Sequence, residues 1–140
     1  MTGLNNFLCF SMRSAMKKIE RGLGGKMLEQ GISIPQWFIL NCLLEEDGIT
    51  LKEIGHRSLI DSSSMTVLVD KLEREGLVER RLDPQDRRAI RIFILPKGKQ
   101  IGEEADHWAS EFNALLYDLL GECNQKEFVH GINNIIKGLD

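Results

Sequence analysis

The stretch LDPQDRRAIRI, residues 82–92, decides how this chain is interpreted. It joins two strand candidates, residues 77–82 and residues 90–94, and the second is dense in β-branched and aromatic residues. Asp83-Pro84 is turn chemistry, because proline presets φ and an aspartate caps its own turn. The pattern predicts a β-hairpin with Arg87 and Arg88 at its tip.

The hairpin is basic although the chain is not. Residues 80–91 hold five arginines against two aspartates, a local charge of +3, whereas the whole chain is formally −3. A basic hairpin on an acidic protein indicates a polyanionic partner that binds at this one surface. A solvated hairpin tip is the alternative, and the helices that precede the hairpin favour the polyanion.

Length and composition set broad limits. A chain of 140 residues fits a single domain with its own core. No run approaches the ~18 apolar residues of a membrane span, and the N-terminus lacks the features of a secretory signal. Cys9, Cys42 and Cys123 are scattered and form no C-x-x-C pair, so no disulfide framework or structural zinc site is predicted. We expect a cytoplasmic protein without cofactor, metal or membrane contact.

Periodicity and capping motifs predict the helices around the hairpin. Apolar residues from Leu4 to Leu23 follow i, i+3/i+4 spacing and predict one long helix that ends near the glycines of residues 22–25 or a little beyond. Capping boxes follow at Ser33, Thr50 and Asn124. Further helices are predicted from Ser33 to Asp47 (apolar nearly all round, hence buried), from Thr50 to about Arg57, from Asp61 to Glu75, from Gly98 to Gly121 and from Asn124 onward.

A short helix, a turn, a longer helix and a basic hairpin together predict a helix-turn-helix with a wing. The longer helix buries Met65, Leu68, Val69 and Leu72, which lie at i, i+3, i+4 and i+7. Its opposite face carries Ser63, Ser64, Thr66, Val67, Asp70, Lys71 and Arg74. The predicted fold class is therefore mainly α with a small β-hairpin wing.

Short polar side chains suit a helix that enters the major groove of DNA. The hydroxyls can reach phosphates or base edges, and Val67 can contact a thymine methyl. Asp70 can accept a hydrogen bond from a cytosine amino group, and Lys71 can donate one to guanine or phosphate. The helix N-terminus favours a phosphate, Arg87 or Arg88 suits the neighbouring minor groove, and Arg80, Arg81 and Arg91 can hold the DNA backbone. The alternatives are plain capping by the serines and pairing of Lys71 and Arg74 on a solvated face. The DNA-binding candidates are Ser62, Ser63, Ser64, Thr66, Val67, Asp70, Lys71, Arg80, Arg87 and Arg88.

Three segments carry a resemblance to a known family. TLKEI at residues 50–54, SMTVLVDKLEREGLVER at residues 64–80 and DPQDRRA at residues 83–89 resemble the multiple-antibiotic-resistance regulator (MarR) family. The resemblance implies that Asp86 fixes the wing and that Arg88 is its minor-groove residue. Two departures are Leu95, where the family often has a capping threonine, and Ser58-Leu59, where it tends to have a large apolar residue and then glycine.

The resemblance also implies an assembly and a function. Residues 1–31 and 99–140 would be dimerisation helices, and residues 32–98 the winged DNA-binding core of a single subunit. We expect a homodimer that binds a roughly palindromic double-stranded operator as a repressor and is released by a small lipophilic or phenolic effector. A pocket for that effector would lie between the core and the dimer helices, with Met12, Met16, Trp37, Trp108 and Phe112 as candidate lining.

Other functions stay open on particular residues. Cys9 matches the thiol of the peroxide-sensing branch, but the tyrosine partners of that branch correspond here to Arg13 and Leu23, so a small core residue is the preferred interpretation. An enzyme is not expected, because Ser62–Ser64, His56 and Asp61 lack a nucleophile elbow or oxyanion loop. A protein-binding winged helix is the other alternative, although such a wing has no need for paired arginines.

Overall fold

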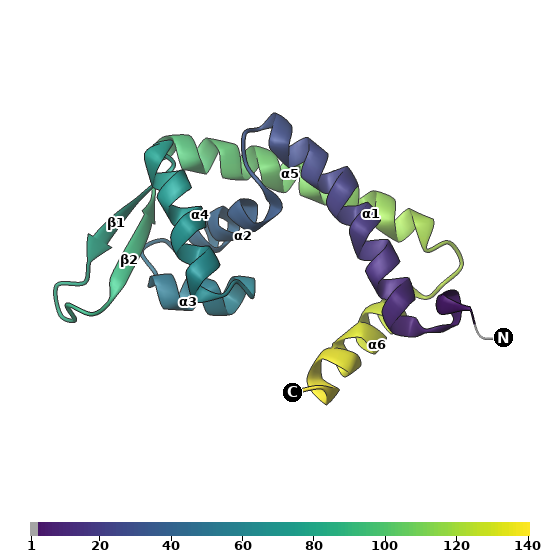
Figure 1. Cartoon of the computed structure of the whole chain (residues 1–140). Coiled ribbons are helices and arrows are strands. Elements are labelled where there is room, and N and C mark those ends of the chain that lie inside the picture. The colour runs from purple at the N-terminus through teal and green to yellow at the C-terminus, as the bar shows by residue number, and fades with distance from the viewer. Residues whose placement is uncertain (1–2) are drawn as a thin grey trace. The chain divides into compact units, whose positions relative to one another are not determined.

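The structure, a computed structural model, describes residues 3–140 (Figure 1). Its elements, in chain order, are a short 3-10 helix η1 (Leu4–Asn6), α1 (Leu8–Glu29), α2 (Ile34–Glu45), α3 (Leu51–Ser58), α4 (Ser62–Arg74), β1 (Val78–Leu82), β2 (Ile90–Ile94), α5 (Pro96–Leu119) and α6 (Gln125–Gly138). They form two compact units, one that ends at Trp108 and one that comprises Ala109–Asp140. The predicted fold class, mainly α with a hairpin wing, is confirmed. None of the helices within residues 3–140 combines the length and apolar character of a membrane span.

The predicted capping motifs start their helices. Ser33 accepts a hydrogen bond from the Gln36 N–H at 3.3 Å, and Gln36 Oε1 accepts from the Ser33 N–H at 2.9 Å, so this capping box is complete. Thr50 and Asn124 likewise accept from the N–H three residues on. The Glu53 carboxylate, however, accepts from Arg57 Nε at 2.8 Å.

The first helix starts later than predicted and ends a little beyond its glycines, as the prediction allowed. Leu4 lies in η1, and α1 begins only at Leu8. The glycines at residues 22–25 do not end α1, because buried Leu23 and Met27 hold that segment against the core. The helix ends at Glu29, and Gly31 follows with a φ of +82°. The other bounds lie within two residues of their predictions, with β1 starting at Val78 and α5 at Pro96.

The core of the first unit is formed by the inward faces of α2, α3, α4 and β2, together with buried residues of α1 and α5. Met65, Val69 and Leu72 of α4 are buried as predicted, while Leu68 is half-buried. The prediction that α2 is buried nearly all round is wrong at Phe38, which is 38% exposed. Apolar residues that are buried almost completely include Ile39, Leu40, Leu43, Ile54, Met65, Leu72 and Ile92.

The wing is fixed to the helices at its base. β1 and β2 are antiparallel, with Arg80 opposite Ile92 and Leu82 opposite Ile90. The segment before α3 extends this ladder, because Gly48 N–H donates to the Ile92 carbonyl and Ile92 N–H donates to the Ile49 carbonyl, both at 3.0 Å. The hairpin therefore projects from the core with a constrained base and an exposed tip (Figure 1).

The turn between α3 and α4 contains an unusual residue. Leu59 has a φ of +58°, in the left-handed region that glycine favours, and its side chain is 93% exposed. For a residue with a Cβ this conformation costs roughly 1–2 kcal/mol. The sequence has leucine at this turn, where the MarR family tends to have glycine. A leucine therefore adopts the left-handed conformation here.

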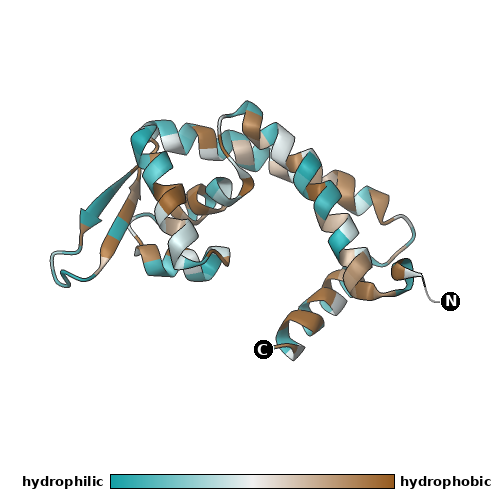
Figure 2. Ribbon diagram, in the orientation of Figure 1, coloured by the Kyte–Doolittle hydropathy of each residue, from teal (hydrophilic) through white to brown (hydrophobic). Residues whose placement is uncertain are grey.

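The last helix is apolar but not buried. No residue of α6 is buried in the subunit, and Figure 2 shows apolar residues along it. The exposed fractions are 45% for Phe128, 58% for Ile136 and 82% for Leu139. Residues of α1 and the 3-10 helix are similarly exposed, with 64% for Leu4, 51% for Phe7 and 62% for Leu8.

Candidate nucleic-acid interface

Asp61 organises the first turn of α4. Its Oδ1 accepts from the Ser64 N–H at 2.9 Å and from the Ser63 hydroxyl at 2.7 Å, and its Oδ2 accepts from the Ser64 hydroxyl at 3.1 Å. These hydrogen bonds, led by the one from the Ser64 N–H, lower the pKa of the Asp61 carboxyl. Asp61 is thus the N-cap of α4, and Ser63 and Ser64 donate their hydroxyl hydrogens to it instead of capping the helix themselves. Both residues are exposed.

The outward face of α4 is exposed along its length. Ser62, Ser63, Ser64, Thr66, Val67, Asp70 and Lys71 all lie on the surface. The Thr66 hydroxyl donates to the Ser62 carbonyl at 3.1 Å. The side chain of Lys71 makes no hydrogen bond or ion pair within residues 3–140, which leaves its ammonium available to a ligand.

Arg80 connects the wing to α4. Its guanidinium contacts the carboxylates of Asp70 and Glu73, the latter at 2.9 Å, and its backbone N–H donates to Glu73 at 2.9 Å. Sequence reasoning placed Arg80 against the DNA backbone and Asp70 against cytosine. The structure instead brings these two side chains together with Glu73, so the guanidinium is shared between two carboxylates and helps fix α4 against β1.

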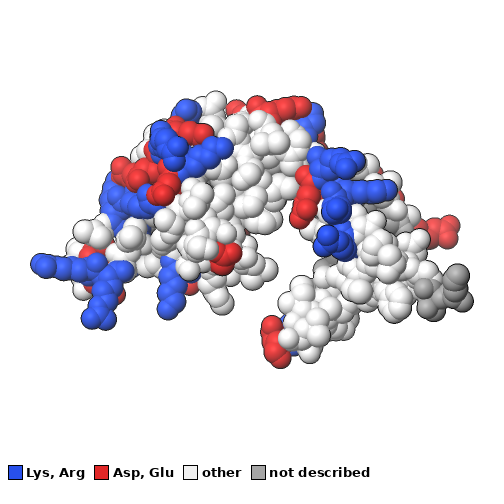
Figure 3. Space-filling model, in the orientation of Figure 1, with Lys and Arg blue, Asp and Glu red and all other residues white. Residues whose placement is uncertain are grey.

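The wing tip is shaped by two aspartates. Asp83 accepts from the Gln85 N–H at 2.9 Å and from Arg91 Nε at 2.8 Å, and these contacts lower the pKa of its carboxyl. Asp86 accepts from the Arg88 N–H at 3.0 Å. Arg87 and Arg88 are exposed and make no ion pair within the described part of the chain. Figure 3 shows basic side chains projecting at this tip.

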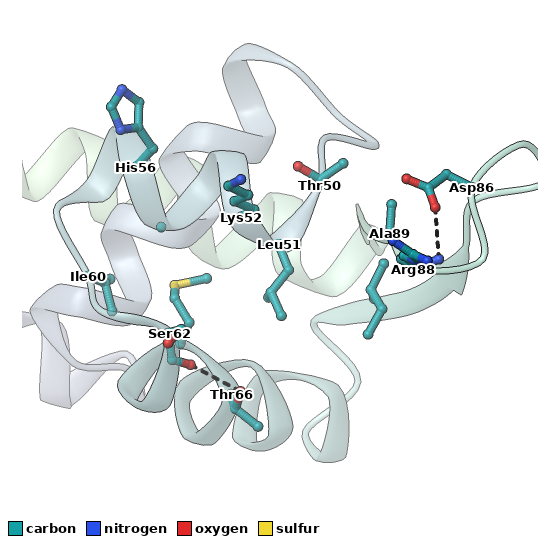
Figure 4. A pocket seen from close by; sticks show the side chains of 13 residues that line it. Thr50, Leu51, Lys52, His56, Ile60, Ser62, Thr66, Asp86, Arg88 and Ala89 are labelled. Atoms are coloured by element: carbon teal, nitrogen blue, oxygen red, sulfur yellow. Dashed lines mark hydrogen bonds between the residues drawn. The ribbon is translucent and has the colours of Figure 1, made fainter.

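A groove of about 790 Å³ joins α4 to the wing (Figure 4). Ser62, Met65 and Thr66 of α4 line one side, and Asp86, Arg88, Ala89 and Ile90 of the wing line another. Lys52 and His56 of α3 also line it, and sequence reasoning missed them. Their i, i+4 spacing on the first helix of the motif places both on one face, and that spacing could have identified them.

A family model described as "MarR family" matches residues 32–90. The HTH-type transcriptional regulator SarZ of Staphylococcus saprophyticus is 30% identical over 100 residues, which cover 71% of this chain and 68% of SarZ. The chain belongs to the MarR family.

Two further relatives extend this comparison. The HTH-type transcriptional regulator TtmR of Methylorubrum extorquens is 34% identical over 74% of this chain, and the chain spans about half of TtmR, 53% of its length. The organic hydroperoxide resistance transcriptional regulator of Bacillus subtilis is 26% identical over 73% of this chain and 69% of its own length.

Solved MarR-type structures share the fold. The PcaV transcriptional regulator of Streptomyces coelicolor, in complex with its natural ligand, superposes with a TM-score of 0.89 at 22% identity and covers 100% of this chain and 99% of PcaV. The transcriptional repressor CouR, bound to a 23-mer DNA duplex, superposes with a TM-score of 0.86 at 22% identity over 95% of this chain and 94% of CouR. The fold and the family are those of transcription regulators.

Cys9 is not buried as a small core residue would be. Cys9 is exposed in the subunit, so its interpretation as a small core residue is wrong for the chain taken alone. It follows Phe7 and Leu8, which are also exposed. Tyr117 lies on α5, in the other compact unit, and the thiol of Cys9 makes no hydrogen bond within residues 3–140.

Trp37 and Trp108 have different surroundings. Trp37 Nε1 donates to Asp106 Oδ1 at 2.7 Å, and Asn41 Nδ2 donates to the same oxygen at 2.9 Å. Trp108 lines a separate surface groove with His107 and Glu104, and Lys26 Nζ lies 4.7 Å from the centre of a Trp108 ring. The predicted effector pocket stays a prediction.

Proposed function

We propose that the chain is a sequence-specific, double-stranded DNA-binding transcription regulator that acts as a homodimer. In this proposal α4 enters the major groove and the β1–β2 tip reaches the adjacent minor groove. The observation that carries it is the single groove lined by Thr66 of α4 and Arg88 of the wing, both exposed. The CouR fold, solved on a DNA duplex, supports the same use of these elements.

In this proposal the candidate residues divide between phosphate contacts, base contacts and support of the wing and α4. Ser62 and the N-terminal N–H groups of α4 hold a phosphate, Val67 and Lys71 face base edges, and Arg87 and Arg88 enter the minor groove. Asp86 shapes the tip through its hydrogen bond from the Arg88 N–H. Arg80 and Asp70 act on each other and position α4, and Ser63, Ser64 and Thr66 offer DNA their oxygen lone pairs.

The regulatory part of the proposal is a repressor that a small lipophilic or phenolic molecule releases. PcaV, which shares the fold, was solved with its natural ligand, and this supports a small-molecule effector. Residues 1–31 and 99–140 would then supply the dimerisation helices around a DNA-binding core at residues 32–98. An effector that favours a DNA-incompetent spacing of the two α4 helices lowers operator affinity by its differential affinity for the two states.

Arg88→Ala is expected to weaken operator binding by about 1–3 kcal/mol, the range for a lost specific contact. The operator is first selected from a random duplex pool, and affinity is then measured by fluorescence anisotropy at several salt concentrations. Arg21→Ala, which removes an exposed arginine of α1, is the matched control and should bind like the wild type. Wild-type affinity should fall steeply with salt, since several phosphates are neutralised.

Two results would contradict the DNA proposal. Unchanged binding by Arg88→Ala at moderate salt would remove the wing from the interface. Failure of the random pool to enrich any sequence would favour a winged helix that binds protein instead.

Peroxide sensing through Cys9 is the second candidate, and the exposure of the thiol favours it. A sensing thiolate needs nearby donors, and Cys9 has no hydrogen-bond donor within residues 3–140. We therefore expect organic hydroperoxide to leave both the wild type and Cys9→Ser on the operator. Release of the wild type at low equivalents, with Cys9→Ser still bound, would make Cys9 the sensor.

A further inference from the structure

The polar side chains on the outward face of α4 are largely committed inside the protein. The hydroxyl hydrogens of Ser63 and Ser64 go to Asp61, and that of Thr66 goes to the Ser62 carbonyl. Asp70 is held by the guanidinium of Arg80. These three hydroxyl hydrogens and the Asp70 carboxylate are therefore already paired before any ligand arrives, whereas the ammonium of Lys71 is not.

The centre of the same face is apolar and open. Val67 is 68% exposed, one helical turn after Ser63 and one before Lys71. It lines a shallow groove of about 620 Å³ together with Leu59, Ile60 and Leu68. An exposed valine makes no favourable contact with water. Burying it against another apolar group lowers the free energy of the complex.

We propose that Val67 is a specificity-determining residue that reads the C5-methyl group of a thymine. This inference rests on the proposed function, since it requires α4 to lie in the major groove. Of the base-pair edges in that groove, thymine alone presents a methyl group. With Asp70 paired to Arg80, the centre of α4 discriminates by apolar contact rather than by accepting a hydrogen bond from cytosine.

Replacing thymine by deoxyuridine tests this directly, because it deletes the methyl group and keeps every hydrogen-bonding group of the base. Each thymine of the selected operator is replaced in turn, and affinities of the wild type and Val67→Ala are measured by anisotropy. We expect one position per half-site at which the wild type binds the deoxyuridine duplex about fourfold more weakly for each thymine replaced, the scale of one buried methyl group. Val67→Ala should bind the thymine duplex about as weakly and show no further loss on deoxyuridine.

The outcomes separate this inference from the proposed function. If deoxyuridine has no effect at any position while Arg88→Ala still weakens binding, Val67 does not read thymine and the DNA proposal stands. If deoxyuridine weakens the wild type and Val67→Ala equally, another residue contacts the methyl group and the inference is overturned. If no duplex is selected from the random pool, the proposed function fails and this inference fails with it. Thermal unfolding of Val67→Ala should match the wild type, because the side chain is mostly exposed.

Discussion

Gly98→Ala is expected to lower the free energy of unfolding by about 3 kcal/mol, the upper part of the range for overpacking. Gly98 lies in the first turn of α5, directly against the residue that precedes β1. A Cβ added there would lie 2.0 Å from the Leu77 carbonyl oxygen and 2.9 Å from its carbon. Both are backbone atoms, and the same oxygen accepts from the Leu95 N–H at 2.9 Å, so no side-chain rotation relieves the clash.

The measurement is urea unfolding followed by circular dichroism. Gly25→Ala is the matched control, because Gly25 also lies in a helix and a Cβ there meets nothing within 4 Å. Helix propensity predicts that this control is stabilised by up to ~1 kcal/mol. Equal midpoints for Gly98→Ala and the wild type would show that α5 can shift away from Leu77 without loss.

Local chemistry made most of the secondary structure predictable. The capping residues Ser33, Thr50, Asp61 and Asn124 each start a helix, because their side chains satisfy an N–H that the helix leaves unpaired. The bounds of β2 were predicted without error, since its β-branched run is followed directly by Leu95-Pro96. Each of these signals lies within a few residues of the element that it determines.

Contacts between distant segments were not predictable in the same way. The glycines of α1 stay helical because Leu23 and Met27 are buried, and Gly98 is required by a carbonyl that belongs to Leu77. Arg80 and Asp70 were each assigned to DNA, yet they pair across ten positions of the chain. A sequence pattern shows that two such residues are charged, but only the fold shows that they meet.

Removing residues 122–140 is expected to convert the protein from a dimer to a monomer and to abolish operator binding. The deletion takes away all of α6, which has no buried residue and leaves Phe128 and Ile136 exposed in the subunit. Burying side chains such as Phe128, Ile136 and Leu139 in a second copy would stabilise a dimer by about 1.5–3 kcal/mol each if the burial were complete. A monomer presents a single α4 and cannot span two half-sites one helical turn apart. Sedimentation velocity gives the assembly state, and anisotropy gives the affinity.

A point substitution distinguishes lost assembly from lost folding. Ile136→Glu places a charge on the apolar face of α6, and Asn134→Glu places the same charge on an exposed polar position of that helix. We expect Ile136→Glu to sediment as a monomer and to lose operator binding, and Asn134→Glu to remain a dimer that binds. Because α6 contributes no buried residue to the subunit, the circular dichroism spectra of both variants should match that of the wild type. A wild-type protein that is monomeric at micromolar concentration, or an Ile136→Glu variant that still sediments as a dimer, would exclude α6 from the interface.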